Sequence, residues 1–298
     1  MTHNKAAGNT AATTCAGCAQ DDWDVRIVRR VGRLEDFPLA LDPQGPIRRI
    51  AVIDTETTGT DPDRDEIIDI AYVILQVDAR GEICGIERWG QALRDPGMPI
   101  PPMITQLTGI TDHDVRGLAV DLDALQAILS GVDACIAHNC KFDSVFLQNL
   151  LPAMADAPWA CSARDFDWFE AGFDGRARAL GYLLMQANFF NKGHRAMADV
   201  ISLIHLLAWR QPNGQTVIGT LLANAERDTV RVEANGAGYH KRSVLKARGY
   251  RWDPAANVWW IEVSQEQVDD ETLWLRLQVL PYGPAPRTVP LSWRQRHR

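Results

Sequence analysis

The sequence predicts an α/β fold, in which helices cover both faces of a mixed sheet and a small α+β unit follows. Three observations support this prediction. Strand-like apolar segments at 50–53, 67–77 and 83–93 follow one another through short turns, which favours an antiparallel start to the sheet. Helical and strand-like segments then alternate along the chain. After a break with Pro and Gly at 211–214, a second series of short elements occupies 229–280.

The composition is that of an ordinary globular protein. The chain has 298 residues, of which 46% are hydrophobic and 23% charged, enough for one large domain and a small one. No apolar run reaches the roughly 18 residues of a membrane helix, and no secretion signal is evident at the N-terminus, so we expect a cytoplasmic protein without a membrane partner. The net charge of −7 excludes a protein that coats nucleic acid through phosphate contacts, but not an enzyme with acidic metal ligands.

Shifts in composition divide the chain into predicted segments. These are a disordered tail (1–22), an N-terminal extension (23–46), a main domain (47–212), a connecting helix (213–228), a small α+β domain (229–280) and a flexible, basic, Pro-rich tail (281–298). The six cysteines are scattered, so reduced thiols are expected. Cys15 and Cys18 form a C-x-x-C, but no second pair follows at zinc-site spacing, which favours a chance pair in a loose tail.

The main domain is predicted to be organised around the stretch 50–59, with the sequence IAVIDTETTG. Its four apolar residues are typical of a strand buried on both faces. Asp54 and Glu56 follow two residues apart, so they project from the same side of the strand. Two carboxylates this close repel each other, and a hard cation such as Mg²⁺ or Mn²⁺ would remove the repulsion. The stretch alone is equally compatible with a strand that continues into an acidic surface loop.

Two further carboxylates stand where apolar side chains are expected. At helical spacing, Asp143 shares a face with Phe146 and Leu147, and Asp199 shares one with Leu203. A carboxylate on an apolar stripe is costly unless it is paired or bound to a metal, and no matching set of buried-looking Arg or Lys is evident. Together with the two acids of the central strand, they predict a site for a pair of divalent ions.

His194 precedes Asp199 by five residues and follows Gly193, so it is predicted to lie in a loop at the mouth of a helix. A lone histidine is more often structural than catalytic. Beside a metal-activated water, however, an imidazole suits the task of a general base.

Three motifs in this order resemble those of the DEDDh exonuclease family, which includes the proofreading epsilon subunit of bacterial DNA polymerase III and ribonuclease T. They are Asp54-x-Glu56-Thr57-Thr58-Gly59, His138-Asn139-x-x-Phe142-Asp143 and His194-Arg195-Ala196-x-Ala198-Asp199. The resemblance covers about residues 47–210. It implies a ribonuclease H-like fold and 3′-to-5′ hydrolysis of phosphodiester bonds with two metal ions, Mg²⁺ or Mn²⁺. A histidine, rather than a tyrosine, before the last Asp marks the subclass.

The resemblance also implies a role for each site residue. Asp54 would bridge both ions, while Glu56 and Asp199 would hold the ion that activates water. Asp143 would support the second ion, which stabilises the departing 3′-oxygen. His194 would take the proton from the attacking water.

Expected substrate contacts are carried over in the same way. Backbone groups near Thr57 and Thr58 would meet the terminal 3′-hydroxyl. Asn139 is expected to be a helix N-cap as well as a candidate contact. Thr108 lies in a stretch that resembles the family's loop at the terminal nucleotide, but many members have His there, which leaves the nucleotide preference open.

The small domain offers a second nucleic-acid surface. Residues 236–251 contain five basic residues, among them Lys241 and Arg242, and no acid, and aromatic residues are interleaved or close by. Cations combined with aromatic residues suit single-stranded nucleic acid. The tryptophans of this domain are favoured as its core, and the lysines and arginines as the nucleic-acid surface.

The sequence therefore predicts a metal-dependent 3′–5′ exonuclease that acts on single-stranded DNA or frayed 3′ ends, in proofreading or repair, with a DNA polymerase as a candidate partner. Within the enzyme class, the alternative is an exonuclease that trims RNA 3′ ends. From another class, the alternative is a nucleic-acid- or polymerase-associated binding module with a vestigial site. The complete set of four acids and His194 counts against the vestigial alternative.

Overall fold

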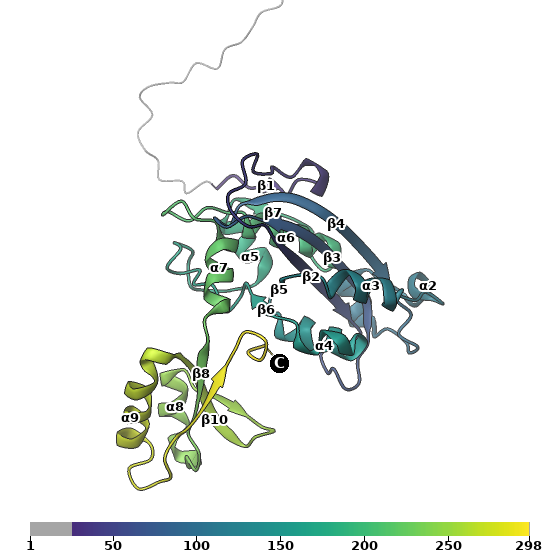
Figure 1. Cartoon of the computed structure of the whole chain (residues 1–298). Coiled ribbons are helices and arrows are strands. Elements are labelled where there is room, and N and C mark those ends of the chain that lie inside the picture. The colour runs from purple at the N-terminus through teal and green to yellow at the C-terminus, as the bar shows by residue number, and fades with distance from the viewer. Residues whose placement is uncertain (1–25, 298) are drawn as a thin grey trace, which may run out of the picture.

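The computed structural model describes residues 26–297, which form a larger main unit and a smaller C-terminal unit (Figure 1). The tail predicted over 1–22 and the Cys15–Cys18 pair lie outside the described residues. Within the described part, no helix combines the length and the apolar character needed to cross a membrane.

A mixed sheet of five strands forms the centre of the main unit, in the order β4-β3-β2-β5-β6. Its strands are β2 (Arg48–Thr57), β3 (Ile67–Val77), β4 (Ile83–Leu93), β5 (Ala134–Ala137) and β6 (Trp159–Cys161). β2, β3 and β4 pair antiparallel, whereas β5 runs parallel to β2 and β6 parallel to β5. The predicted mixed sheet with an antiparallel start is confirmed.

Helices cover both faces of this sheet, as predicted. They are α3 (Leu122–Leu129), α4 (Lys141–Leu150), α5 (Leu180–Gln186), α6 (Ala196–Leu207) and α7 (Val217–Glu226). Because side chains alternate along a strand, Ile50 and Val52 share a core with α5, α6 and α7, while Ala51 and Ile53 share the other core with α3 and α4. β2 is therefore buried on both faces, which explains its continuous apolar run.

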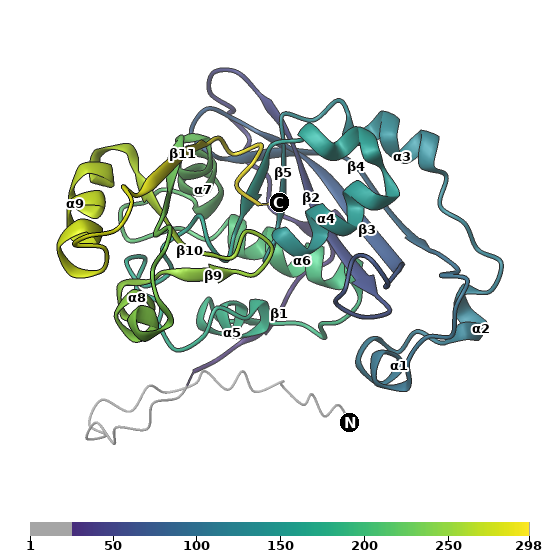
Figure 2. The ribbon, with the colours of Figure 1, turned by 90° about the horizontal axis from the view of Figure 1, so that it is seen from below.

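Short elements complete the main unit. They are β1 (Arg29–Arg30), β7 (Phe189–Phe190), α1 (Pro102–Thr108), α2 (Asp112–Val115) and the 3₁₀ turns at Leu34–Asp36 and Pro152–Asp156. β1 pairs with β7, and this pairing ties the N-terminal extension to the segment before α6. α1 and α2 lie at the end of the main unit remote from the small unit (Figure 2).

The helix predicted as a connector is also part of the main core. The apolar side of α7 is fully enclosed there, as the burial of Val217, Ile218 and Leu221 records. Its Thr216 N-cap hydroxyl accepts from Gly219 N and donates to Gly81 O, which fixes the start of the helix against the β3–β4 turn. The helix predicted within 213–228 is thus present and leads to the small unit, but it also belongs to the main core.

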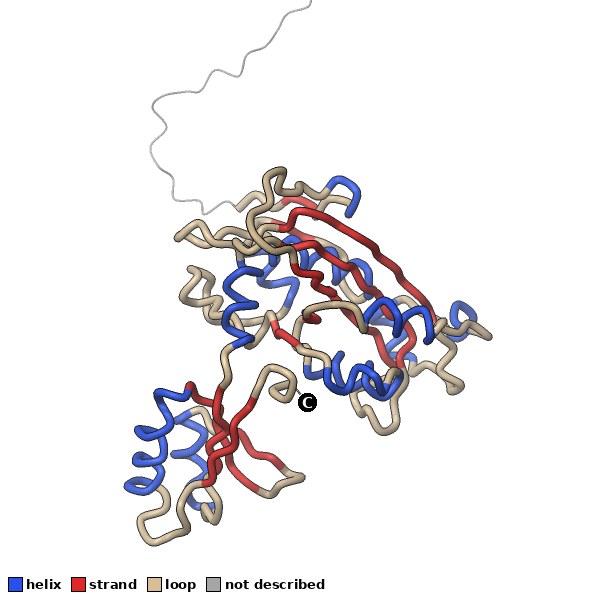
Figure 3. The backbone as a smooth tube through the Cα atoms, in the orientation of Figure 1, coloured by secondary structure: helices blue, strands red, loops and turns tan. Residues whose placement is uncertain are grey.

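The small unit is a four-stranded antiparallel sheet in the order β11-β8-β10-β9. It comprises β8 (Thr229–Glu233), α8 (Arg242–Arg248), β9 (Arg251–Asp253), β10 (Val258–Ser264), α9 (Val268–Gln278) and β11 (Arg287–Leu291), with 3₁₀ turns at Tyr239–Lys241 and Gln265–Gln267. Figure 3 shows α8 and α9 on the face of this sheet turned away from the main unit. Trp259 and Val263 pack beneath these helices, so the predicted core role is confirmed for Trp259. It is wrong for Trp252, which is 45% exposed because β9 is an edge strand of the sheet.

The segment predicted as a flexible basic tail is ordered structure. β11 pairs with β8 along its whole length, and Pro290 is tolerated because β11 is an edge strand. Residues 292–297 then reach the main unit, where His297 O accepts a 2.6 Å hydrogen bond from Ser144 Oγ. The prediction failed because the basic residues find acidic partners. Arg287 pairs with Glu233 of the small unit, and Arg296 pairs with Glu262 of the small unit and with Asp165 of the main unit.

Candidate active site

Three carboxylates meet where β2 ends and α6 begins. Asp54 and Glu56 continue the face of β2 that packs on α6, and Asp199 lies in the first turn of that helix. Each offers one carboxylate oxygen, and these oxygens all lie within 4.8 Å of one another. The structure thus brings together three of the four predicted acids, on two elements far apart in the sequence.

Asp143 approaches from the opposite layer. It lies in the first turn of α4 and is 2% exposed. Its Oδ1 accepts hydrogen bonds from the backbone N–H of Thr55 at 3.0 Å and from the Thr55 hydroxyl at 2.8 Å. Thr55 faces α4 because it alternates with Asp54 along β2. The fourth acid is therefore hydrogen-bonded to the strand that carries Asp54. Its charge contributes to the raised pKa of Asp54.

Burial and mutual repulsion dominate the electrostatics of the cluster. Burial, followed by the charges of Asp143 and Asp199, raises the pKa of Asp54 well above its usual range. Burial and the charge of Asp199 raise the pKa of Glu56 to about 8. Burial also raises the pKa of Asp143 to about 7, against the hydrogen bonds from Thr55. A divalent cation would favour the ionised forms, so these residues fit the metal site that the sequence implies.

In the absence of divalent metal, stability is expected to fall as the pH rises from about 4.5 to about 8. The folded protein holds a proton on Glu56 across this window, whereas the unfolded chain releases it near its ordinary pKa of 4.5. Because the folded state binds more protons, raising the pH favours unfolding. Thermal unfolding in EDTA at a series of pH values measures the effect. Glu56→Gln should flatten the curve, Glu170→Gln at an exposed site should not, and stability that rises over this window would contradict the assignment.

His194 lies at the mouth of the cluster and is exposed. Its backbone has a φ of 65°, and its N–H donates to Asp199 Oδ2 at 2.7 Å. Gly193 approaches so closely that a Cβ there would meet Asp199 Oδ1 at 3.2 Å. Burial raises the pKa of Asp199, while the hydrogen bond and the charge of His194 oppose this shift. The loop therefore holds His194 beside the acid that the resemblance assigns to the water-activating ion.

Sequence reasoning missed Asp69, which is paired with Glu56 in the β2–β3 register. Asp69 is fully buried, accepts hydrogen bonds from Gln91 Nε2 at 2.8 and 2.9 Å, and pairs with Arg195 at 3.3 Å. It thereby holds Arg195, whose charge lowers the pKa of Glu56. Asp69 could have been found from the sequence, because it is an acid inside an otherwise apolar strand. The same kind of anomaly pointed to Asp143 and Asp199.

The predicted threonine contacts lie in turns that use their own hydroxyl groups. Thr58 Oγ1 donates to Asp65 Oδ1 and accepts from Glu66 N, both at 3.0 Å, and the Thr57 hydroxyl donates to Gly59 O. Thr108 Oγ1 likewise donates to Ile104 O and accepts from Ile110 N. All three threonines are buried, so only backbone groups of the 57–59 turn remain for a substrate end.

The prediction that Asn139 caps the N-terminus of α4 is wrong. The N-cap is Cys140, and Asn139 adopts a φ of 64° one residue earlier. Asparagine tolerates this left-handed conformation, in which its backbone O accepts from Phe142 N. Its side chain is exposed and lies on the wall of a cleft beside α4.

This cleft has a volume of about 1170 Å³ and separates the two units. Basic and aromatic residues from both units contribute to its walls: Lys141, Arg164, Arg178, Arg231, Arg251, Trp252 and Trp260. Partial desolvation and then the charge of Arg164 lower the pKa of Arg251, an exposed residue, while the charge of Glu262 opposes this shift. Across residues 26–297, no carboxylate forms an ion pair with either of these two guanidinium groups.

Lys241 and Arg242, the predicted nucleic-acid contacts, do not line this cleft. The Lys241 ammonium donates to Gln278 O at the end of α9, at 2.8 Å. The Arg242 guanidinium lies 4.3 Å from the centre of the Tyr239 ring. Both partners belong to the small unit, and the structure does not bring either cation to the carboxylates of the candidate active site.

The mixed sheet gathers acids at the end of its central strand, an arrangement that suits divalent cations. Residues 51–207 match the RNase_T family, which is described as Exonuclease, so the chain belongs to the exonuclease family, as predicted. PolC-type DNA polymerase III of Listeria monocytogenes is 38% identical over 102 residues, and that of Streptococcus agalactiae is 37% identical over 98 residues. Each match spans 32% of this chain and 6% of the polymerase.

Solved structures of exonucleases are also similar. Exonuclease X in complex with 5′ overhanging duplex DNA covers 57% of this chain and 99% of its own, at 22% identity and a TM-score of 0.41. A full-length 3′-exonuclease covers 55% of this chain and 60% of its own, at 18% identity and a TM-score of 0.42.

Proposed function

We propose that this protein is a metal-dependent 3′–5′ exonuclease that removes nucleotides from the 3′ ends of DNA, in proofreading or repair. The observation that carries the proposal is the set of three carboxylate oxygens from Asp54, Glu56 and Asp199 within 4.8 Å. DNA is the proposed substrate, and a DNA polymerase the proposed partner, because the matched curated relatives are DNA polymerases.

The acids would hold two divalent ions, Mg²⁺ or Mn²⁺. Asp54, Glu56 and Asp199 would share one ion, and Asp143 would support the second from the α4 side. When bound, such ions activate the attacking water and stabilise the leaving oxygen of an in-line displacement. The raised pKa values of Glu56 and Asp143 support this assignment, because burial and neighbouring acids disfavour their ionised forms and a bound divalent cation would favour them.

His194 takes the proton from the attacking water. This role is supported by its exposure at the mouth of the cluster and by the hydrogen bond that holds its backbone on Asp199. The 57–59 turn, fixed by its own hydroxyl groups, offers backbone donors and acceptors to the terminal 3′-hydroxyl. Asp69 acts by holding Arg195 next to Glu56.

The cleft between the units is proposed as the path of the strand. Arg164 and Arg251 face each other without a paired acid in the described chain, so a phosphate between them would relieve their repulsion. Trp252 is 45% exposed and offers a stacking surface for a base. Asn139 and Lys141, at the start of the helix that carries Asp143, line the cleft.

The proposed activity is tested with 5′-labelled single strands of DNA and RNA, with Mg²⁺, Mn²⁺ or EDTA. A ladder of labelled products that shorten from the 3′ end, formed faster on DNA and absent in EDTA, is expected. Immediate release of the label as a mononucleotide would overturn the polarity, and undiminished degradation in EDTA would overturn the metal dependence. Faster cleavage of RNA would favour the RNA-trimming alternative.

Neutralising the cleft cations should weaken binding of single-stranded DNA and make it less sensitive to salt. For Arg164→Gln and for Arg251→Gln, the slope of log K against log salt should drop by about 0.7, the value for one phosphate contact on a single strand. Fluorescence anisotropy with a labelled oligonucleotide and Ca²⁺ in place of Mg²⁺ provides the measurement.

Arg242→Gln is the matched control, since this arginine belongs to the same small unit but does not line the cleft. Its salt dependence should equal that of the unmodified protein. An equal loss in Arg242→Gln would instead favour the α8 surface over the cleft.

A further inference from the structure

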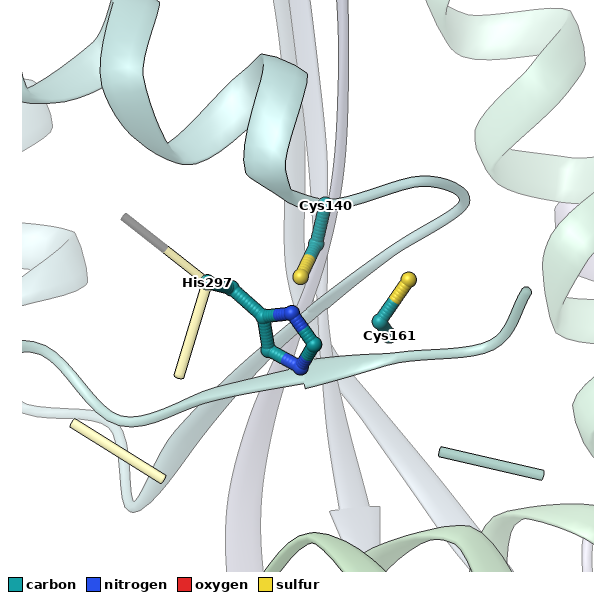
Figure 4. A group of neighbouring side chains, drawn as sticks. All are labelled: Cys140, Cys161 and His297. Atoms are coloured by element: carbon teal, nitrogen blue, oxygen red, sulfur yellow. The ribbon is translucent and has the colours of Figure 1, made fainter. Parts of the chain in front are cut away.

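Residues 292–297 bring a histidine against two cysteines of the main unit (Figure 4). Cys140 is the N-cap of α4 and Cys161 is the last residue of β6. Both cysteines are fully buried and His297 is 5% exposed. One potential ligand atom from each residue lies within 4.8 Å of the other two. Figure 4 shows the Cys140 sulfur next to the imidazole and the Cys161 sulfur across from it.

A contact with Asp165, on the side of the imidazole away from the two sulfur atoms, fixes the orientation of the ring. Asp165 Oδ2 lies 2.7 Å from His297 Nε2 and also accepts a 2.7 Å hydrogen bond from the backbone N–H of Cys161. This contact leaves Nδ1 of His297 for the side of the sulfur atoms. Histidines that bind metals commonly donate their second ring nitrogen to a carboxylate, which sets the tautomer and the direction of the ring.

The donor set selects the kind of ion. Two thiolates and one imidazole are soft or borderline ligands, which favour zinc over Mg²⁺ or Ca²⁺. This set differs from the four carboxylates of the candidate active site, whose oxygen atoms suit hard cations. The two thiols are not joined in a disulfide.

We propose that Cys140, Cys161 and His297 bind one zinc ion that fastens segment 292–297 to the main unit. Each cysteine releases its proton on binding, so the two thiolates balance the charge of the ion. A water molecule supplies the fourth ligand. Both His297 and Asp165 line the cleft between the units, from which this water can enter.

The position of the site gives the ion two structural effects. It joins the end of β6, the start of α4 and segment 292–297, three pieces that are remote in sequence. Because Cys140 immediately precedes α4, the ion also restrains the helix that presents Asp143 to Thr55. The ion is thus structural, and its loss should loosen segment 292–297 without removing any active-site carboxylate.

Metal content tests the proposal directly. Full-length protein purified without chelators should contain about one zinc per chain, measured by inductively coupled plasma mass spectrometry. The variants Cys161→Ser and His297→Ala should contain almost no zinc. Cys84→Ser is the matched control, because this cysteine lies on β4 outside the cluster, and it should retain the zinc. Asp54→Asn should also retain it, which separates this site from the carboxylate cluster.

Cobalt substitution identifies the ligands. Co²⁺ added to the zinc-free protein should give a thiolate-to-cobalt charge-transfer band in the near ultraviolet, weakened in Cys161→Ser and unchanged in Cys84→Ser. A zinc-free protein that gives no such band, or a band of full strength in Cys161→Ser, would overturn the proposal. A Cys140–Cys161 disulfide in the protein as purified, found by mass spectrometry without reductant, would overturn it as well.

Limited proteolysis keeps the proposal testable if a cysteine variant fails to fold. With Mg²⁺ present, a zinc-selective chelator should accelerate tryptic cleavage at Arg294 and Arg296 several-fold in the unmodified protein. His297→Ala should be cleaved at that faster rate with or without the chelator. Equal cleavage rates for the unmodified protein in both conditions would contradict a zinc-fastened segment.

Discussion

Replacing Asp54 with asparagine is expected to abolish exonuclease activity while making the metal-free protein more stable. Activity should fall roughly 10³-fold or more, because metal ions in such a site supply several kcal/mol of transition-state stabilisation. Stability should rise because Asp54 is repelled by Asp143, Asp199 and Glu56, and the neutral amide removes that repulsion. The expected gain is a few degrees in Tm, since ~1 kcal/mol shifts Tm by roughly 2–4 °C in a protein of this size.

Activity on labelled DNA in Mg²⁺ and thermal unfolding in EDTA measure the two effects together. Asp63→Asn is the control, since this acid is exposed in the turn after the central strand and should change neither quantity. An Asp54→Asn protein that is inactive but less stable in EDTA would indicate a structural defect rather than the loss of a metal ligand.

His194→Asn should reduce kcat by roughly 10²–10⁴-fold, the usual contribution of a positioned general base. Asparagine is the better replacement because position 194 has a φ of 65°, which asparagine tolerates and most other side chains resist. The dependence of the remaining activity on Mg²⁺ concentration should not change, because the histidine is not a proposed ligand. Single-turnover cleavage of DNA provides the measurement.

Lys192→Ala, two residues earlier in the same exposed loop, is the control and should retain full activity. Added imidazole should partly restore activity to His194→Gly, but not to Asp199→Asn. Activity of His194→Asn within a factor of about ten of the unmodified protein would exclude a general base at this position.

Local periodicity carried most of what the sequence could predict. The spacing of two in a strand places Asp54 and Glu56 on one side of β2, and that side faces α6 in the structure. Helical spacing likewise places Asp143 and Asp199 on buried faces, where their isolation among apolar residues made them conspicuous. These four acids could be predicted from the sequence, because each one interrupts the apolar pattern of its own strand or helix.

Features that depend on a partner far away in the sequence, or on a single residue's backbone, could not be predicted from local patterns. Lys241 looks free in the sequence, yet its ammonium donates to Gln278 O, a partner 37 residues away that only tertiary packing brings close. β6 has three residues, too few for a strand period to appear. The left-handed backbone of Asn139 is a single-residue choice that no spacing records.

The small unit is joined to the main unit twice, once by the chain between α7 and β8 and once by the returning segment 292–297. Arg296 donates to Ala225 O at 2.9 Å beside the first junction, and His297 is bound to Asp165 and Ser144 at the second. A body attached at two points keeps one easy motion, rotation about the line through both attachments. Such a rotation would move the β9–β10 hairpin, which carries Arg251 and Trp252, relative to the main-unit wall of the cleft. The width of the proposed strand path would then change through this one motion.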